Sequence, residues 1–426
     1  MKVAVVGMAK SGMAAAQLLL ERGHEVWGVD EKLGPGFSGQ GPVRILPQND
    51  EAFEGAELIV LSPGVPADLR KWTVPVIGDL ELASWYLQGP VIGITGANGK
   101  TTTTALTGHI LGSTAQVGGN IGTPPCSMVA TSRAGQWNVL ELSSFQLETT
   151  QKFRAEIGAC LNVTPDHLDR HYTFENYAEA KAQLFVRQRE GDWAVLNVDD
   201  ATCRFYAERG AGRPVWFSST QTVSPGAYLD RGEIILDGER LMAASEVPLR
   251  GVHNLENTMA AAAIAKLAGA PLSQIREAVM TFPGVEHRIE FVREMNGVAY
   301  YNDSKATNVD ATLKSIGAFE GGLWIILGGK DKNSDYTVLR EPLGKKARAA
   351  LLIGAAAEKI ASQLDGSVEL IRCGTLENAI RQGSSRAAKG DTVLLAPACA
   401  SFDQFQSYEH RGREFKRLVR ELPWQS

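Results

Sequence analysis

The stretch of this sequence with the clearest chemistry is Val91 to Thr104, which reads V-I-G-I-T-G-A-N-G-K-T-T-T-T. A β-branched run ends here in a glycine-rich turn, and a segment that can form a helix follows. Glycine allows close backbone approach to an anion, and the first N–H groups of the helix point at the same spot. Lys100 can neutralise phosphate charge, and Thr101 can bind the Mg²⁺ that accompanies ATP. The stretch predicts a phosphate-binding loop made by Gly96, Ala97, Asn98, Gly99, Lys100, Thr101 and Thr102.

The loop departs in one place from the general pattern G-x-x-x-x-G-K-[ST]. Ile94 stands where that pattern has its first glycine. A strand, a set of amides, a lysine and a threonine still follow in the right order. The alternative interpretation is a glycine-rich turn between a strand and a helix that carries a lysine by chance.

Gly7 to Gly12, with the sequence G-M-A-K-S-G, is similar to the dinucleotide fingerprint G-x-G-x-x-G. Ala9 replaces the middle glycine and would hinder the close approach of a pyrophosphate. Three interpretations therefore stay open, namely an NAD site, a structural turn, and a site for a different nucleotide. The residues that would hold such a nucleotide are Ser11, Asp30, Lys32 and the turn Ser62-Pro63-Gly64.

Two polar residues stand out on the central strands. Glu141 is the single acid in the apolar run Trp137 to Leu142, and His167 follows the run Ile157 to Val163. Parallel strands end on one edge of a sheet, so Glu141, His167 and Thr101 are expected to meet there. A lone carboxylate is seldom buried unless it is paired or bound to a cation. We predict a metal site, or a carboxylate hydrogen-bonded to the metal's ligands.

Lys181 lies on the apolar face of the helix expected from Phe174 to Arg187. A lysine in this position either reaches water with its ammonium group or has a function. Burial would lower its pKa and provide a neutral, reactive amine. Asn254 and Asn257 share one face at the start of a later helix and are either caps or ligand contacts.

Strand-like and helical runs alternate along the whole chain, which is typical of α/β folds with parallel sheets. Gln88-Gly89-Pro90 and Pro283-Gly284 mark two boundaries. We therefore expect three domains, at 1–88, 89–284 and 285–426. In the last of them, polar loops follow three strands, at Asn302–Asn308, Gly328–Lys332 and Pro397–Asp403, and a ligand surface is expected there.

The composition of the 426 residues excludes several classes of protein. Apolar residues make up 44% and charged residues 21%, no apolar run approaches the roughly 18 residues of a membrane span, and no signal layout opens the chain. We expect a cytoplasmic protein. The five cysteines lack metal-binding spacing and are interpreted as buried apolar residues. A net charge of −5 without a basic tract gives no indication of nucleic-acid binding.

The combination of motifs resembles the Mur ligase family, and within it the branch that adds D-glutamate. The resemblance covers the whole chain. Its motifs are T-G-A-N-G-K-T (95–101), G-G-N-I-G (118–122), L-E-L-S-S-F-Q-L-E (140–148), T-P-D-H-L-D-R-H (164–171), Lys181, H-N-x-x-N (253–257), H-R (287–288), N-D-S-K-A-T-N (302–308) and A-C-A-S-F-D-Q-F (398–405).

The resemblance implies a Rossmann-like first domain for the uridine diphosphate end of UDP-N-acetylmuramoyl-L-alanine, a P-loop ATPase-like second domain and a Rossmann-like third domain. Asn120, Ser143 and Gln146 would hold the muramoyl-alanine and diphosphate. ATP would lie in the phosphate loop with its adenine near Asn254 and Asn257, and Arg288 and Asp303 would close on it. D-glutamate would bind to residues of the third domain, namely Lys305, Thr307, Lys332, Ser401 and the backbone of Phe402.

The family also implies two Mg²⁺ sites, at Thr101, Glu141, His167 and a carbamylated Lys181, and catalytic roles for Lys100, Lys181, His167 and Glu141. The implied reaction is ATP-dependent amide formation through an acyl phosphate in peptidoglycan precursor synthesis. We expect the protein to act as a monomer. The alternatives are a sister ligase or a folylpolyglutamate synthase with another acceptor, and a P-loop nucleotide-binding switch without a second substrate.

Overall fold

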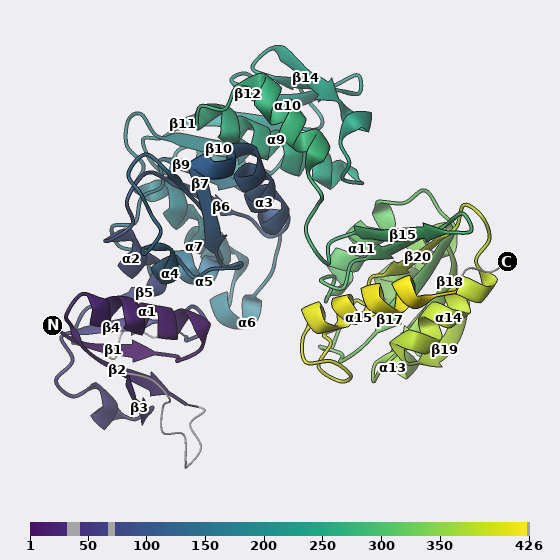
Figure 1. Cartoon of the computed structure of the whole chain (residues 1–426), viewed down its shortest axis with the longest axis horizontal. Coiled ribbons are helices and arrows are strands. Elements are labelled where there is room, and N and C mark those ends of the chain that lie inside the picture. The colour runs from purple at the N-terminus through teal and green to yellow at the C-terminus, as the bar shows by residue number, and fades with distance from the viewer. Residues whose placement is uncertain (32–42, 67–72, 424–426) are drawn as a thin grey trace. The chain divides into compact units, whose positions relative to one another are not determined.

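The computed structural model describes residues 1–31, 43–66 and 73–423. The chain divides into two compact units, one made of 1–248 with 253–282 and the other of 249–252 with 283–426. The change of unit falls next to Pro283-Gly284, where the sequence predicts a boundary. Two sheets lie in the first unit and one in the second (Figure 1). The prediction of three largely parallel sheets with flanking helices is confirmed.

The first sheet is entirely parallel, with strand order β3-β2-β1-β4-β5. Its strands are β1 (Lys2–Val6), β2 (Glu25–Asp30), β3 (Arg44–Pro47), β4 (Leu58–Leu61) and β5 (Val76–Gly78), with helices α1 (Lys10–Glu21) and α2 (Asp79–Ser84). The strand order reverses at β1, because β2 lies on one side of it and β4 on the other. Ligands of open α/β sheets bind outside the carboxyl ends of the strands at such a point. The turns after β1 and β4 are therefore placed where the sequence predicts a nucleotide site.

The second sheet has nine strands in the order β14-β13-β12-β11-β10-β9-β6-β8-β7. They are β6 (Val91–Thr95), β7 (Ala115–Gly119), β8 (Trp137–Glu141), β9 (Ile157–Cys160), β10 (Trp193–Asn197), β11 (Arg213–Ser218), β12 (Gly226–Asp230), β13 (Glu233–Leu236) and β14 (Glu239–Ala243). Pairing is parallel from β7 to β12, and β12 to β14 form antiparallel hairpins. All five residues of β6 are buried, as expected for a central parallel strand covered on both faces.

The other helices of the first unit lie between or after the strands of this second sheet along the chain. They are α3 (Lys100–Leu111), α4 (Pro125–Met128), α5 (Ser144–Leu147), α6 (Leu168–His171), α7 (Phe174–Val186), α8 (Ala201–Tyr206), α9 (Val252–Leu267) and α10 (Leu272–Thr281). The approach of α7 to β6 depends on Gly93, because a Cβ atom there would lie 2.7 Å from the side chain of Leu184. Lys181 lies one helical turn before Leu184, so this packing brings Lys181 close to the end of β6.

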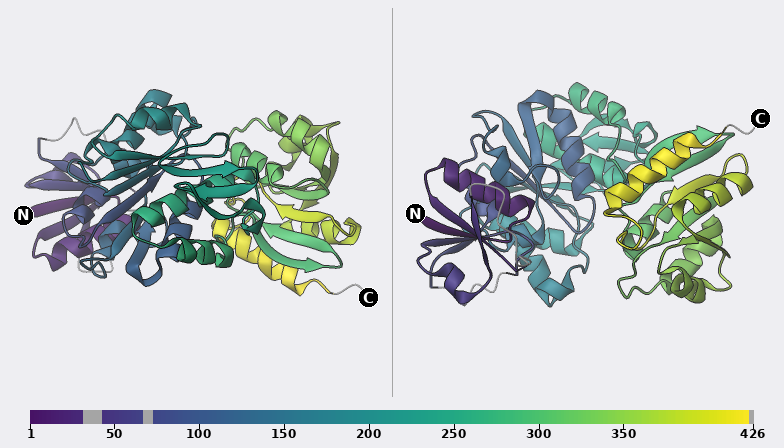
Figure 2. Two further views of the ribbon diagram at one scale, coloured as in Figure 1. Left: turned by 90° about the horizontal axis from the view of Figure 1, so that it is seen from above. Right: turned by 60° about the horizontal axis from the view of Figure 1, so that its bottom comes forward.

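The third sheet has the order β15-β16-β20-β17-β18-β19 and is parallel except for the hairpin of its first two strands. Its elements are β15 (Glu290–Met295), β16 (Val298–Asn302), α11 (Val309–Gly317), β17 (Leu323–Gly328), α12 (Arg340–Lys346), β18 (Ala347–Ile353), α13 (Ala357–Leu364), β19 (Glu369–Gly374), α14 (Leu376–Arg386), β20 (Thr392–Leu395) and α15 (Tyr408–Glu421). The long helix α15, yellow in Figure 2, packs against β15, β16 and α14.

One sequence prediction about side-chain class is tested by the structure. All five cysteines are free and buried, which confirms their interpretation as apolar residues. In residues 1–31, 43–66 and 73–423, no helix combines the length and the apolar character that crossing a membrane requires.

The two sheets of the first unit are joined by Glu81, a fully buried carboxylate in α2. It accepts hydrogen bonds from the backbone N–H groups of Gln151, Lys152 and Phe153, at 2.8–2.9 Å, and from the indole of Trp85 at 3.0 Å. Burial alone would raise the pKa of Glu81, but these donors together lower it. The carboxylate is thus the hydrogen-bond acceptor for three successive backbone N–H groups that precede β9 of the second sheet.

We expect Glu81→Ala to lower the free energy of unfolding by about 2–4 kcal/mol, because the substitution leaves buried N–H groups without an acceptor. Urea unfolding would measure the change, with the exposed Glu54→Ala as the control that should stay within ~0.5 kcal/mol of the wild type. A carboxyl whose folded pKa is lowered stabilises the protein above its unfolded pKa of 4.5 and loses that contribution as pH falls further. The difference between wild type and variant should therefore be constant at neutral pH and shrink in acid.

Candidate functional site

The loop after β6 has the backbone shape that anion binding requires. Gly96 and Gly99 have φ angles of 149° and 87°, where side chains are disfavoured. At Gly99 a Cβ atom would also lie 2.2 Å from Oδ1 of Asn257. The next residue, Lys100, begins the twelve-residue helix α3. The N–H groups of its first turn and the positive end of its dipole face the space in front of the loop.

Asn162, just after β9, holds this loop in shape. Its backbone oxygen accepts from the N–H of Ala97 at 2.8 Å, and its Oδ1 accepts from the N–H of Asn98 at 2.9 Å. Its amide nitrogen donates back to the Asn98 oxygen at 3.1 Å. Asn162 carries no signal in the sequence, because only the pairing of β9 with β6 brings it to a loop 64 residues earlier.

Two lysines meet at the carbonyl oxygen of Gly96. Lys100 donates to it at 2.8 Å and to the Ala97 oxygen at 3.0 Å, while Lys181 donates to it at 2.9 Å. Lys181 is only 1% exposed, and its nitrogen lies 4.6 Å from the ring centre of Tyr177. The alternative in which Lys181 reaches water is therefore wrong. Burial, assisted by the charge of Lys100, lowers the pKa of Lys181 to about 7, so a neutral amine is present at physiological pH.

Glu141 ends β8 as a buried carboxylate that is only half satisfied. It is 2% exposed, and its Oε1 accepts from the side chain of Asn120 at 2.9 Å. Its Oε2 is buried and has no hydrogen-bond partner among the described residues. Such an atom is costly unless a cation or a donor satisfies it. A hard oxygen ligand is what Mg²⁺ prefers, so Glu141 fits the predicted metal role.

His167 lies in the loop between β9 and α6 with a positive φ of 52°. Its half-exposed ring makes an edge contact with Phe145, at 4.9 Å between ring centres, and its Nε2 lies 3.6 Å from Asp166. Thr101 and Thr102 are buried in the first turn of α3. In the part of the chain that the structure describes, no three His, Cys, Asp or Glu side chains gather as a metal site. The predicted set of Thr101, Glu141, His167 and Lys181 stays a prediction.

Asn254 and Asn257 lie inside α9 rather than in front of it, so neither is its N-cap residue. Both are buried, and Asn257 donates to Oδ1 of Asn254 at 3.0 Å. Oδ1 of Asn257 accepts from the hydroxyl of Thr103 at 3.3 Å and, as described above, faces Gly99. The two asparagines therefore lie directly behind the phosphate loop. Their contact with ATP stays a prediction.

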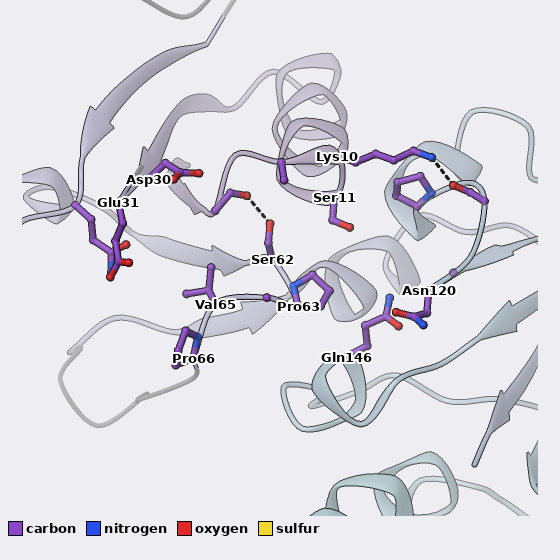
Figure 3. A pocket seen from close by; sticks show the side chains of 17 residues that line it. Lys10, Ser11, Asp30, Glu31, Ser62, Pro63, Val65, Pro66, Asn120 and Gln146 are labelled. Carbon is purple, nitrogen blue, oxygen red and sulfur yellow. Dashed lines mark hydrogen bonds between the residues drawn. The ribbon is translucent and has the colours of Figure 1, made fainter. Parts of the chain in front are cut away.

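A cavity of about 790 Å³ lies beside the carboxyl ends of β1 and β4 (Figure 3). It contains most of the residues that the sequence analysis assigned to the UDP substrate, namely Ser11, Asp30, Ser62, Gly64, Asn120 and Gln146. Both sheets of the first unit contribute to its wall. Asn120 lines the cavity and also holds Glu141, so the cavity and the predicted metal ligand share one side chain.

Local hydrogen bonds fix the wall of this cavity. The hydroxyl of Ser62 donates to the Gly7 oxygen at 2.6 Å, and Oδ2 of Asp30 accepts from the N–H of Met8 at 2.7 Å. Lys10 crosses to the loop after β7 and donates to the Gly122 oxygen at 2.5 Å, as Figure 3 shows. The turn after β1 is thereby held on both sides.

One predicted substrate residue in the described part of the chain does not line this cavity. Ser143 is the N-cap of α5, where its hydroxyl accepts from the N–H of Gln146 and its own N–H donates to the Gln146 side chain. A helix cap thus explains Ser143 without a ligand. Lys32 lies outside the described residues.

Arg170 was not singled out from the sequence, although it supports the same cavity. Its guanidinium donates to the Val65 oxygen at 2.8 Å and pairs with Glu148. Val65 belongs to the turn after β4, and Arg170 follows His167 by three residues. Arg170 thus joins the loop that carries His167 to the wall of the cavity.

In the second unit, the three predicted polar loops meet at one edge of the third sheet. The backbones of Lys330 and Ala400 exchange hydrogen bonds at 2.8 and 3.2 Å, and Ala398 donates to the Ala306 oxygen at 2.9 Å. This meeting confirms the expectation that polar groups gather at the carboxyl ends of these strands. Asp303 begins the first loop and is buried, with a hydrogen bond from Ser315.

Neighbouring groups of this unit offset the burial of Asp303 only in part. Burial raises the pKa of Asp303, while Ser315 and the Arg288 guanidinium act in the opposite direction. Among the predicted D-glutamate residues, Ser401 is buried, Thr307 and Lys305 are partly buried, and Lys332 and Phe402 are exposed. The nitrogen of Lys305 lies 5.6 Å from the ring centre of Tyr408. Their ligand roles stay predictions.

Arg411 joins two of these loops from α15 and was missed in the sequence. It is 1% exposed and donates to the hydroxyl and oxygen of Ser304, at 3.0 and 2.9 Å, and to the Cys399 oxygen at 3.2 Å. Burial lowers the pKa of Arg411 to about 10. The amphipathic pattern of α15 shows a helix face but not that one of its arginines is buried.

Comparisons with known proteins agree on one family. Residues 94–265 match the Mur ligase middle domain, and residues 287–399 match the Mur ligase glutamate ligase domain. A protein of Solibacter usitatus named UDP-N-acetylmuramoylalanine--D-glutamate ligase is 58% identical, with 98% of this chain and 97% of the relative covered. A protein of the same name from Acidobacterium capsulatum is 48% identical, with 98% and 96% covered.

Solved structures show the same fold. MurF ligase from Thermotoga maritima, crystallised with ADP, has a TM-score of 0.64 at 19% identity and covers 99% of this chain and 95% of its own. UDP-N-acetylmuramate-alanine ligase from the same organism has a TM-score of 0.63 at 18% identity and covers 99% of both chains. The phosphate loop, the sheet order and the full-length relatives together show that this chain belongs to the Mur ligase family.

Proposed function

We propose that this chain is the ADP-forming ligase that joins D-glutamate to UDP-N-acetylmuramoyl-L-alanine in cytoplasmic peptidoglycan precursor synthesis. Asn120 carries the proposal, because it lines the 790 Å³ cavity and also binds Glu141. A substrate held in that cavity would present its free carboxylate toward the phosphate loop. The names of the full-length relatives support D-glutamate as the second substrate.

Each part of the chain then has one task. Residues 1–88 bind the UDP end of the substrate, 89–284 bind ATP, and 285–426 bind D-glutamate. ATP places its phosphates against the loop Gly96–Thr102 and its adenine near Asn254 and Asn257, and Arg288 and Asp303 complete the site. Thr101, Glu141, His167 and a carbamylated Lys181 would hold two Mg²⁺ ions, which would supply positive charge against the phosphate oxygens. The protein acts as a monomer.

The reaction follows from the charges. The substrate carboxylate attacks the γ-phosphorus in line, the bond to the β-phosphate oxygen breaks, and an acyl phosphate and ADP form. Lys100 neutralises the oxygens that repel the incoming carboxylate. The D-glutamate amine then attacks the acyl carbon, and the tetrahedral intermediate releases phosphate and a proton as the amide forms. Water would hydrolyse the acyl phosphate, so the site must exclude water during both steps.

Phosphate release tests this proposal directly. With ATP, Mg²⁺ and UDP-N-acetylmuramoyl-L-alanine, we expect release to require D-glutamate and to stay at background with L-alanine, L-lysine or L-glutamate. Turnover with UDP-N-acetylmuramate and L-alanine would instead indicate a sister ligase, and turnover of a folate with L-glutamate a folylpolyglutamate synthase. Nucleotide binding that no second substrate stimulates would support a P-loop switch and contradict the proposal.

A further inference from the structure

Asp79 is a buried carboxyl group for which the proposed reaction has no use. It is the first residue of α2, directly after β5, and is 1% exposed. Neither of its carboxyl oxygens has a hydrogen-bond partner of acceptable geometry among the described residues. Burial raises the pKa of Asp79 to about 7, and the N–H of Leu80 and the hydroxyl of Ser11 limit the rise. The carboxyl is thus close to Ser11 without a completed hydrogen bond.

Ser11, which lies close to Asp79, also lines the substrate cavity. It is the second residue of α1 and lines the 790 Å³ cavity where the diphosphate of the substrate is proposed to bind. The residue that precedes α1, Ala9, provides no side-chain cap. The Ser11 hydroxyl and the backbone N–H groups of the first turn of α1 are therefore the groups of this helix that can meet a diphosphate. A hydroxyl has one hydrogen, so it donates to Asp79 or to the ligand but not to both.

We propose that Asp79 is a positioning residue for the UDP substrate, which in its neutral form donates a hydrogen bond to Ser11 Oγ and so turns the Ser11 hydrogen toward the diphosphate. This inference rests on the proposed function. An ionised Asp79 would have the opposite effect, because it would accept the Ser11 hydrogen and place a negative charge behind the bound anion. Binding of the diphosphate therefore favours the protonated form of Asp79.

The ionisable groups on the elements that pack against Asp79 do not explain a pH dependence of substrate binding near pH 7. Lys10 on α1 is bonded to the Gly122 oxygen. The Cys126 thiol on α4 has a pKa raised well above its usual value by burial and by Asp79, so it stays neutral. Glu81 on α2 is held by the backbone N–H groups described above. Helix α5 and strands β4 and β5, which also pack against α2, contain no charged residue.

Calorimetry of the full-length wild-type chain tests the inference with UDP-N-acetylmuramoyl-L-alanine, in the absence of ATP. The diphosphate of this probe is a diester whose charge is constant from about pH 6 to about pH 9. Titrations in two buffers of different ionisation enthalpy give the protons bound. We expect uptake of up to one proton near pH 8, and a Kd that rises by up to about tenfold per pH unit above pH 7.

The variant Asp79→Asn should remove both effects, because an amide is a permanently neutral donor. Its Kd at pH 8.5 should be at or below the wild-type value, and KM for the UDP substrate should become independent of pH while kcat stays unchanged. Ser11→Ala should weaken binding and reduce the proton uptake, because only the charge of Asp79 then couples to the diphosphate, and adding Asp79→Asn to it should remove the remaining pH dependence. The matched control Glu21→Gln, an exposed acid at the far end of α1, should behave as the wild type.

The outcomes separate the inference from the proposed function. If the wild-type chain fails to bind the UDP substrate, both are wrong. If it binds without proton uptake, or if Asp79→Asn keeps the wild-type pH dependence, the inference alone is wrong. Should Asp79→Asn fail to fold, which thermal unfolding would reveal, proton uptake by Ser11→Ala decides, because uptake as large as that of the wild type without the hydroxyl contradicts the inference.

Discussion

The variant Lys100→Ala is expected to lose ADP formation by roughly 10³-fold or more while it still binds the UDP substrate. Lys100 is held over the phosphate loop by the oxygens of Gly96 and Ala97, at 2.8 and 3.0 Å. From there its ammonium group can meet the phosphate oxygens that repel the substrate carboxylate. Its removal leaves that repulsion uncompensated in the step that forms the acyl phosphate.

Substrate binding should be spared, because Lys100 does not line the 790 Å³ cavity. We expect the Kd for UDP-N-acetylmuramoyl-L-alanine, measured by calorimetry, to stay within about threefold of the wild type. ADP release, followed by a coupled assay, supplies the second measurement. The matched control is Lys152→Ala, which removes an exposed lysine of the same unit and should retain full turnover. A variant that loses substrate binding but keeps its turnover would contradict the assigned role of Lys100.

The sequence predicted those parts of the site that depend on local order. The phosphate loop has its glycines, lysine and threonine in consecutive positions, and strand order then places the turns after β1 and β4 around one cavity. The helical period also predicted that Lys181 lies on the apolar face of its helix, and it proved to be buried. A period of 3.6 residues and the rule that parallel strands end on one edge were sufficient for these predictions.

The residues that were missed act across long separations in the chain. Asn162 shapes a loop 64 residues earlier, and Arg411 joins loops of which one lies 107 residues away. Their types are common, and neither residue belongs to one of the motifs found in the sequence. Ser143 differs from both, because it lies in a motif and its hydrogen bonds form a capping box, while its ligand contact stays a prediction. Only packing distinguishes such roles, and a single sequence contains no direct record of packing.

The variant Lys181→Ala is expected to lose roughly 10²–10³-fold in turnover, and acetate or formate should restore part of it. The wild-type amine is buried, bonded to the Gly96 oxygen at 2.9 Å, and has its pKa lowered to about 7. A neutral amine adds to CO₂ and releases a proton to give a carbamate, whereas an ammonium group cannot react. The product is a carboxylate in place of a buried amine, and the unsatisfied Oε2 of Glu141 also fits a metal role.

Rescue distinguishes this chemistry from a structural role for the lysine. If Lys181 acts as a carbamate, a small carboxylate supplies the missing charge in the space left by Lys181→Ala, and acetamide, which has the same shape without the charge, does not. Lys181→Arg should be inactive with or without acetate, because its guanidinium stays cationic and fills the space. In the wild type, the pKa of Lys181 is lowered to about 7, so the fraction of neutral amine rises between about pH 6 and pH 8. Turnover at a low, fixed concentration of CO₂ should rise over the same range. A mass spectrum of wild-type protein in bicarbonate that shows only the bare amine, together with a Lys181→Ala variant that acetate leaves inactive, would contradict the carbamate and leave Lys181 as a donor that shapes the loop through Gly96.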